Sequence, residues 1–356
     1  MGIRKNVTNL SVGEKMSFVN AVLALKTRPS VLHPMDNSKN RYDDYAEIHL
    51  NAMMAMSMTN PSVDPDWYPG WAHNGPAFFP WHRQLLLQFE KDLQTIDSMV
   101  TIPYWDWTDN ASSPFTLDFL GTDGDVNDPD PLKVNKGPFA YDGPNHWTIN
   151  VKDQDNDPNY LRRGFGRRPD AQSLPTTLDV RNSLAPLNYD NPPWKLNSPG
   201  FRTQVEFRLH NLVHRWVNGT MFLMTSPNDP VFWLHHANVD RLWGDWQSQH
   251  PSVCPYSPTF GSVVGHNLYD QMIFNAMPPS PWADLSTPSM MLDHHALGYT
   301  YDSDPPRVAP IIQPAPAARK GIPDARPVLP LFPLMKDIRA LTQHRGAKKR
   351  RQQRKR

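Results

Sequence analysis

The sequence predicts a mainly α-helical bundle with long irregular loops. Three observations lead to this fold class: five segments carry apolar residues at helical spacing, proline is abundant, and a broad region is rich in Asp, Asn, Gly and Pro. Proline supplies 38 of the 356 residues, about a tenth of the chain against roughly a twentieth in average proteins. Apolar residues make up 39%, so a packed core can form between the loops.

Each expected helix rests on its own pattern. Ser11 and Glu14 form a capping box, and apolar residues then recur at helical spacing through residue 25. A second helix is expected over residues 43–58, and a third follows Pro80 with an apolar stripe on one side. The fourth and fifth are expected over residues 203–216 and 230–247, whereas residues 101–107 look extended and residues 110–200 look irregular.

The last part of the chain has a different composition. Nine prolines lie between Pro305 and Pro333, and eight basic residues with no acidic one lie between Arg345 and Arg356. We therefore expect one domain over residues 1–302 and a separate extension over residues 303–356 with a solvated basic tail. The apolar run at residues 328–335 would aggregate if left exposed. Within this run, residues 331–334 are expected to cap the mouth of the functional site. The alternatives are a disordered tail and a homo-oligomer contact made by the same run.

Composition excludes several classes of protein. Cys254 is the only cysteine, which rules out an internal disulfide, a cysteine-based zinc site and an iron–sulfur cluster. No stretch approaches the roughly 20 apolar residues of a membrane-spanning helix, so no membrane association is expected. The N-terminus has no apolar signal region, so the protein is expected to be cytoplasmic or exported by a route not visible here. We do not expect nucleic acid binding, although the basic tail leaves that alternative open.

The histidines are the most informative residues. His210 and His214 are four residues apart, so both imidazoles leave the same face of one helix. A zinc protease of the HExxH type would need Glu after the first histidine, and Asn211 stands there instead. His236 and His82 each fall on the apolar face of their expected helices.

Two more histidines complete the set. His49 lies within the second expected helix, and His73 lies in a loop nine residues before His82. Taken alone, each of the six would more often be a core histidine, but burying six imidazoles without partners would be costly. Two three-histidine metal sites explain them better. Imidazole ligands suit copper, zinc, iron or nickel, and spacing cannot choose among these metals.

Longer motifs carry a resemblance that selects the metal. The stretch HNGPAFFPWHR, which begins at His73, closely resembles the first copper motif of tyrosinases, and NDPVFWLHHANVDRLW, which begins at Asn228, resembles the second. HNLVHRWVNG from His210, IPYWDW from Ile102 and LGYTY from Leu297 also look like landmarks of this family. Together they cover about residues 4–302. The chain thus resembles the type 3 dicopper proteins, and most of all the bacterial tyrosinases.

This resemblance implies a pair of copper ions with three histidine ligands each. One ion would be bound by His49, His73 and His82, and the other by His210, His214 and His236. His33 competes with His49, but its neighbour Pro34 disfavours a helical ligand position. His235 is left as a structural histidine.

The resemblance also implies an activity, which is the oxidation of phenols by dioxygen. Monophenols would be hydroxylated at the ortho position and o-diphenols oxidised to o-quinones. Glu206 and Asn211 would hold a water that accepts the phenolic proton. The other interpretation of Glu206 is an exposed carboxylate paired with Arg202 or Arg208.

Other features of the site follow from the same resemblance. Leu223 or Met224 would gate the substrate pocket, and Asp240 either supports the ligand rings or is simply exposed. Two alternative functions stay open: a catechol or o-aminophenol oxidase without the hydroxylation step, and an oxygen carrier of the hemocyanin type. A copper-delivery protein is a further candidate partner.

Overall fold

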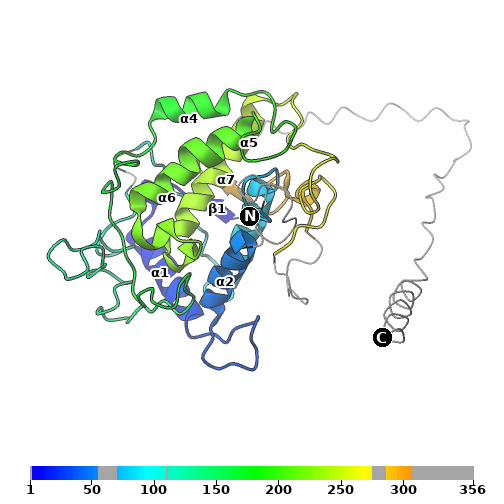
Figure 1. Ribbon diagram of the computed structural model, residues 1–356. Coiled ribbons are helices and arrows are strands. Elements are labelled where there is room, and N and C mark those ends of the chain that lie inside the picture. The colour runs from blue at the N-terminus through cyan, green and yellow to red at the C-terminus, as the bar shows by residue number, and fades with distance from the viewer. Residues whose placement is uncertain (1, 55–69, 110, 112, 275–285, 306–356) are drawn as a thin grey trace, which may run out of the picture. The chain divides into compact units, whose positions relative to one another are not determined.

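The described structure has four long helices, three of which carry candidate metal ligands (Figure 1). The computed structural model describes residues 2–54, 70–109, 111, 113–274 and 286–305. The long helices are α1 (Val12–Leu25), α2 (Arg41–Met54), α3 (Phe78–Gln94) and α7 (Val231–Gln249). The described part of the chain is mainly helical with very little strand, which confirms the predicted fold class.

The ends of these helices follow from local chemistry. The Ser11 side chain accepts a hydrogen bond from the Glu14 N–H, and Glu14 bonds back to the Ser11 N–H, so the predicted capping box begins α1. Helix α3 begins two residues before the predicted Pro80, because proline is tolerated in a first helical turn. The predicted end of the second helix falls in residues 55–69, which lie outside the described residues.

The fourth predicted helix is not a uniform α-helix. It comprises α5 (Phe201–Thr203), a π-helical segment (Gln204–His210) and α6 (Asn211–Val217). A π-helix is rare and is found frequently at functional sites. The hydrophobic pattern could not reveal it, because the one-residue difference per turn between α and π geometry is too small to read from so short a segment.

Three further elements were not predicted. Helix α4 (Thr177–Leu184) interrupts the region expected to be irregular, and it begins with a capping box between Thr176 and Asp179. Strands β1 (Gly2–Arg4) and β2 (Tyr299–Tyr301) pair in parallel, with Gly2 opposite Tyr299. The segment expected to be extended, residues 101–107, forms no strand and makes one isolated bridge, from Tyr104 to Asn6. The remaining short elements are 3₁₀ turns at Val7–Asn9, Gly219–Phe222, Ser226–Asn228 and Pro288–Met291.

A buried ionic cluster joins β1 and β2 to the helices α3 and α7. Asp240 on α7 contacts Arg83 on α3 at 2.5 Å and Arg4 of β1 at 3.3 Å. The hydroxyls of Tyr299 and Tyr301 donate to the same carboxylate at 2.6 Å each. The interpretation of Asp240 as a solvent-exposed residue is therefore wrong, because this carboxylate is buried and lies four residues after His236.

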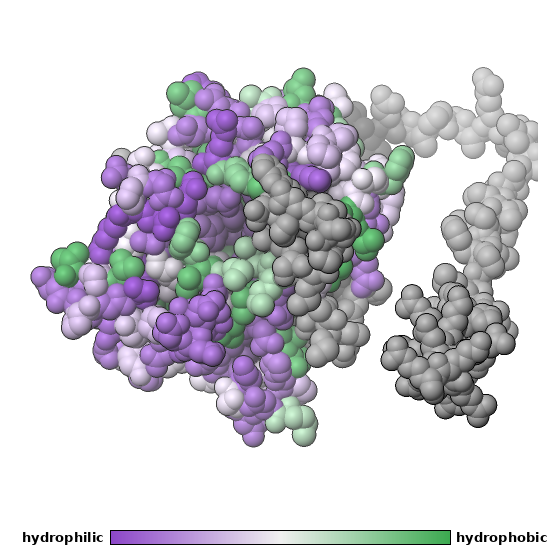
Figure 2. Space-filling view, viewed as in Figure 1, coloured by the Kyte–Doolittle hydropathy of each residue, from purple (hydrophilic) through white to green (hydrophobic). Residues whose placement is uncertain are grey.

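One face of the described structure is mostly polar (Figure 2). Figure 2 shows one face of the molecule, on which hydrophilic residues dominate and apolar residues are scattered between them. Among the described helices, none combines the length and the apolar character that crossing a membrane requires. The predicted domain boundary near residue 302 and the predicted extension stay predictions, because residues 306–356 lie outside the described residues.

Candidate metal centre

Seven buried or half-buried histidines converge in two neighbouring groups. The first group is His49 of α2, His73 of the loop before α3, and His82 of α3. The second group comes from the π-helical segment, α6 and α7 and consists of His210, His214, His235 and His236. Within each group, one ring nitrogen of every member lies within 4.8 Å of the others. The structure thus brings together all six histidines that the sequence singled out.

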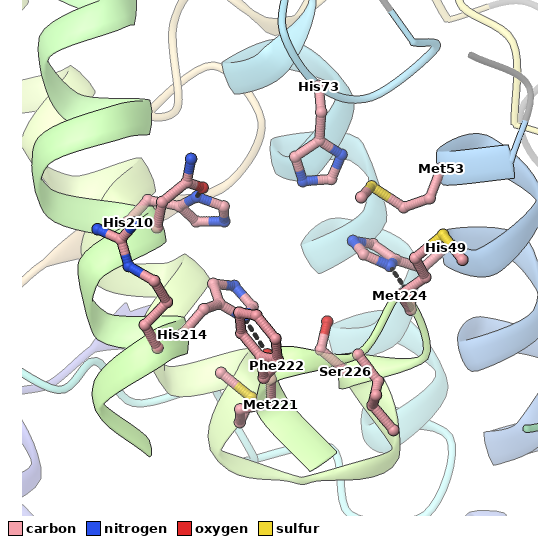
Figure 3. A pocket seen from close by; sticks show the side chains of 12 residues that line it. His49, Met53, His73, His210, His214, Met221, Phe222, Met224 and Ser226 are labelled. Atoms are coloured by element: carbon pink, nitrogen blue, oxygen red, sulfur yellow. Dashed lines mark hydrogen bonds between the residues drawn. The ribbon is translucent and has the colours of Figure 1, made fainter. Parts of the chain in front are cut away.

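The two groups face each other across a short gap. The rings of His82 and His236 stack with centroids 4.2 Å apart, and those of His73 and His210 lie 5.7 Å apart. Figure 3 shows His49 and His73 on one side of a common space and His210 and His214 on the other, with their rings pointing into it. Two metal ions bound by these groups would therefore be close neighbours.

Protein oxygens orient several of the rings through Nδ1. A backbone carbonyl lies 2.6–2.8 Å from Nδ1 of His49, His82 and His214; the carbonyls belong to Met224, Phe78 and Met221, respectively. A carbonyl can only accept, so each Nδ1 carries the proton and each Nε2 presents a lone pair. The Nε2 atoms of these rings and of His210 are buried and have no protein partner. Buried, unpartnered imidazole nitrogens are costly unless they bind a metal, and imidazole is a donor that suits copper as well as zinc, iron and nickel.

Burial keeps these imidazoles neutral. It lowers the pKa of His49 and of His214 to about 4, although the carbonyl bonds to Met224 and Met221 act in the opposite direction. Burial also lowers the pKa of His73, His82 and His210 well below the usual range, and neighbouring imidazoles add to the effect. The rings are therefore in the unprotonated form that binds a metal at neutral pH.

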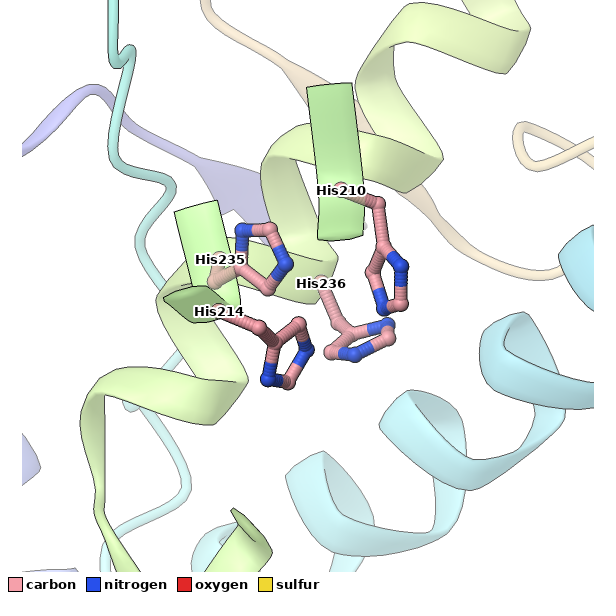
Figure 4. A group of neighbouring side chains, drawn as sticks. All are labelled: His210, His214, His235 and His236. Atoms are coloured by element: carbon pink, nitrogen blue, oxygen red, sulfur yellow. The ribbon is translucent and has the colours of Figure 1, made fainter. Parts of the chain in front are cut away.

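His235 was expected to be structural, and the structure places it within the second group. Its ring stacks on His210 at 5.1 Å and also lies 5.1 Å from Trp107. His236 instead contacts His82 of the first group. Figure 4 shows His236 between His210 and His214, with His235 on the side away from α3. Both rings have buried nitrogens without a protein partner, so burial alone does not separate them.

His33 takes no part in either group. Its Nε2 lies 2.8 Å from a carboxylate oxygen of Glu47, and its side chain is 37% exposed. This histidine hydrogen-bonds to a carboxylate at the surface, which removes the competitor of His49.

Glu206 is buried and holds the loop that carries His73. Its Oε1 accepts a 2.7 Å hydrogen bond from the Asn74 N–H, and its Oε2 accepts one of 3.0 Å from Arg202. The interpretation of Glu206 as an exposed carboxylate is therefore wrong, because this side chain is buried. The expected pairing with Arg202 is present. Burial raises the pKa of Glu206, while Arg202 and the Asn74 N–H oppose that rise.

Asn211, unlike Glu206, contacts one of the candidate ligand rings directly. Its Oδ1 lies 2.8 Å from Nδ1 of His210, so the amide orients that ring, and the side chain also lines a pocket. The Asn211 N–H donates to the backbone carbonyl of Glu206, whereas no hydrogen bond joins their two side chains in the described part of the chain.

The pocket opens beside both histidine groups and has a volume of about 240 Å³. Both candidate gate residues, Leu223 and Met224, line it. Sequence reasoning missed the neighbouring Phe222, which is 47% exposed and carries the Arg168 guanidinium 4.0 Å from its ring centroid. These residues occupy an irregular turn, where no periodic pattern identifies the inward side chains. The full lining is His49, Met53, His73, His210, Asn211, His214, Arg215, Met221, Phe222, Leu223, Met224 and Ser226.

A carboxylate holds this turn in place. The two oxygens of Asp153 accept hydrogen bonds from the backbone N–H groups of Met224 at 2.8 Å and Thr225 at 3.0 Å. The same turn presents the carbonyls of Met221 and Met224 to one histidine of each group (Figure 3). Pocket lining and ring orientation are thus properties of one segment, Met221–Met224. Sequence reasoning missed Asp153, because it lies about 70 residues away from that segment in an irregular loop.

Comparison with known proteins agrees with this geometry. The model of the common central domain of tyrosinase matches residues 39–249. The tyrosinase of Streptomyces glaucescens is 40% identical over 311 residues, which is 85% of this chain and the whole of that protein. A functional unit of octopus hemocyanin has a TM-score of 0.54 at 23% identity, over 85% of this chain and 68% of that one. A polyphenol oxidase of Thermothelomyces thermophila has a TM-score of 0.51 at 23% identity, over 80% and 81%, respectively. With two facing histidine groups and a family model that covers more than half of its length, the chain belongs to the tyrosinase family.

Proposed function

We propose that this chain is a tyrosinase that hydroxylates monophenols and oxidises the resulting o-diphenols to o-quinones. Membership of the family makes the cofactor a pair of copper ions and the chemistry a copper-dependent oxidation of phenols by dioxygen. The observation that carries the proposal is the pair of facing histidine groups, in which every ring has a buried nitrogen without a protein partner.

We assign His49, His73 and His82 to one copper ion and His210, His214 and His236 to the other. The choice of His236 over His235 is supported by its stacking on His82, because a ligand of one ion should lie beside the other site. His235 packs against Trp107 instead, which suits a residue that supports the second group from behind.

When bound, the copper pair supplies the two-electron activation of dioxygen on which phenol oxidation depends. The protein residues do the remaining work. The carbonyls of Met221 and Met224 and the amide of Asn211 hold the ligand rings, and the pocket presents the phenol to the site between Phe222 and the histidines.

Proton removal is the step that separates a tyrosinase from a catechol oxidase in this proposal. A phenol with a pKa of about 10 is almost entirely protonated at neutral pH, so a base must accept its proton. Glu206 is suited to this task, since burial raises its pKa toward the range of an effective base. Each of its oxygens accepts one hydrogen bond and can accept another from a water that Asn211 also contacts.

The alternatives predict other behaviour. A catechol or o-aminophenol oxidase would oxidise o-diphenols and leave monophenols unchanged. An oxygen carrier would turn over neither. The open pocket beside the histidines favours an enzyme over a carrier. Partners beyond phenols and dioxygen, namely a copper-delivery protein and a second copy of the chain, stay predictions.

The test is a pair of rate measurements on the copper-loaded protein, one with tyrosine and one with catechol. We expect quinone formation from both, with a lag for tyrosine. Turnover of catechol alone would contradict the hydroxylation step, and turnover of neither would contradict the proposed enzyme. Copper content measured on the same sample distinguishes an inactive site from an empty one.

A further inference from the structure

Three side chains outside the copper centre converge at the end of β2. His294 and His295 are consecutive, and Asp304 lies nine residues beyond the second of them. Their side chains are 6%, 17% and 11% exposed, respectively. One potential ligand atom of each lies within 4.8 Å of the other two. The proposed oxidation of phenols uses none of them.

The separations of the donor atoms fit a small metal ion. Nε2 of His294 lies 2.9 Å from Oδ2 of Asp304, and Nε2 of His295 lies 3.8 Å from the same oxygen. A tetrahedral zinc ion with ligands at about 2.0–2.2 Å requires donors separated by about 3.4 Å. The two observed separations bracket that value, so small side-chain adjustments would complete the geometry.

The surroundings hold these side chains in position. The Tyr301 N–H donates to Oδ2 of Asp304 at 2.9 Å, which is the outer contact that orients a ligating carboxylate. Gly244 of α7 packs against His294 so closely that a Cβ atom there would lie 3.0 Å from ring atom Cε1. The rings of His294 and His295 lie 4.0 Å apart at 30°, so both project in a similar direction.

The local charge also favours a cation. Burial opposes the ionisation of Asp304, but the hydrogen bonds from His294 and the Tyr301 N–H outweigh it and lower the pKa of that carboxyl. Burial raises the pKa of the nearby Asp245, and the carboxylate of Asp304 adds to the rise against the opposing effect of Arg241.

We propose that His294, His295 and Asp304 form a third metal site, separate from the copper pair, that binds one divalent transition metal ion such as zinc. Two imidazoles and one carboxylate are a donor set for such ions, and three protein ligands leave one position for water. The ion would link the segment before β2 to Asp304, which lies shortly after the end of β2. Tyr299 and Tyr301 of this strand donate to Asp240, so the bound ion would stabilise the cluster that joins α3 and α7.

The experiment is equilibrium dialysis of the fully copper-loaded protein against zinc, followed by elemental analysis. We expect one zinc per chain with the two copper ions retained, and a higher melting temperature in zinc. Calcium is the control ion, since it prefers oxygen ligands and should not be retained. His295→Asn should lose the zinc and the thermal shift, while its copper content and phenol oxidation stay unchanged.

The matched control is His146→Asn, because His146 is an exposed histidine far along the chain with a positive φ of 45° that asparagine tolerates. This variant should keep its zinc. If His295→Asn fails to fold, His295→Gln serves in its place. The proposal is overturned if the native protein retains no zinc, which would leave an ordinary histidine–carboxylate ion pair, or if the His295 variants retain as much zinc as the native chain.

Discussion

Glu206 combines three properties that suit a proton acceptor. It is buried, its pKa is raised by that burial, and its two oxygens are fixed by different partners. Arg202 binds it on one side and the Asn74 N–H on the other, directly after His73 in sequence. Loss of a structural role would therefore disturb the position of His73, whereas loss of a chemical role would slow the removal of the phenolic proton. The two roles can be separated by experiment.

We predict that Glu206→Gln slows monophenol hydroxylation far more than catechol oxidation, because the amide keeps the shape but cannot accept the proton. General-base assistance is worth roughly 100-fold or more, so the ratio of the two rates should fall by about that factor. The ratio is measured as kcat for tyrosine over kcat for catechol at equal copper content.

Asp190→Asn is the matched control for this residue. Asp190 binds Nε of Arg202 at 2.9 Å, so the control disturbs the same guanidinium and leaves the Glu206 carboxylate in place. A control that lowers the ratio as strongly as Glu206→Gln would show that the arginine cluster, and not proton transfer, underlies the effect.

At the scale of elements, the segment Met221–Met224 links the pocket to both copper sites. It supplies one carbonyl to His49 and one to His214, and Asp153 anchors it through two backbone hydrogen bonds. Hydrogen bonds to a charged group contribute about 1.5–3 kcal/mol each. Loss of the anchor should therefore loosen the lining of the pocket and the orientation of two ligand rings together.

We predict that Asp153→Ala raises KM for phenols and speeds the loss of copper to a chelator, each by about tenfold or more. Asp153→Asn should recover part of both effects, because its amide oxygen still accepts a hydrogen bond. The readouts are steady-state kinetics and the rate of copper release during dialysis. Asp155→Ala, two residues away and exposed, is the control, and equal behaviour of the two alanine variants would refute the anchoring role.

The loop that carries His73 depends on another buried histidine. Nδ1 of His266 accepts from the Ala77 N–H at 3.1 Å, and its Nε2 donates to the Gly70 carbonyl at 2.7 Å. Burial lowers the pKa of His266 to about 4, against about 6.5 in an unfolded chain. Protonation would convert Nδ1 into a donor that faces the Ala77 N–H, and the two donors would repel each other.

The sign of the pH effect follows from this difference. Between pH 6.5 and 4 the unfolded chain binds a proton at His266 that the folded chain does not, so folding stability is complete above pH 6.5 and falls as the pH falls toward 4. A difference of this size corresponds to about 3 kcal/mol once the pH is below both values. We predict that the melting temperature of His266→Gln falls less over this range than that of the native protein. Parallel curves for the two proteins would show that another group controls the acid sensitivity.

At the scale of the whole molecule, residues 306–356 provide a test of regulation by the extension. Residues 331–334 of the apolar run are expected to cap the pocket mouth. We expect a chain that ends at residue 305 to oxidise bulky phenols faster with its copper content unchanged. An unaltered rate would contradict capping, and size-exclusion chromatography of the same truncation would then distinguish a solvated tail from an oligomer contact.

The extent to which the molecule could be predicted differs between its parts. The helices and the six candidate histidines could be predicted, because helical periodicity and sequence motifs can be recognised within short stretches of chain. The π-helical segment, the pairing of β1 with β2 and the Asp153 anchor were not, since each depends on contacts between residues far apart in sequence or on a small change in helical pitch. The burial of Glu206 and Asp240 could not be predicted from the sequence either, because a charged residue is buried only when its partners are in place.

Two groups of three histidines are proposed to bind two copper ions, and copper content tests this assignment most directly. Elemental analysis of the purified, copper-loaded protein should give two copper ions per chain. His236→Ala should lose at least one of them, whereas His235→Ala should keep both. A native protein with fewer than two copper ions at saturation, or a His235→Ala chain that loses copper while His236→Ala retains it, would contradict the account.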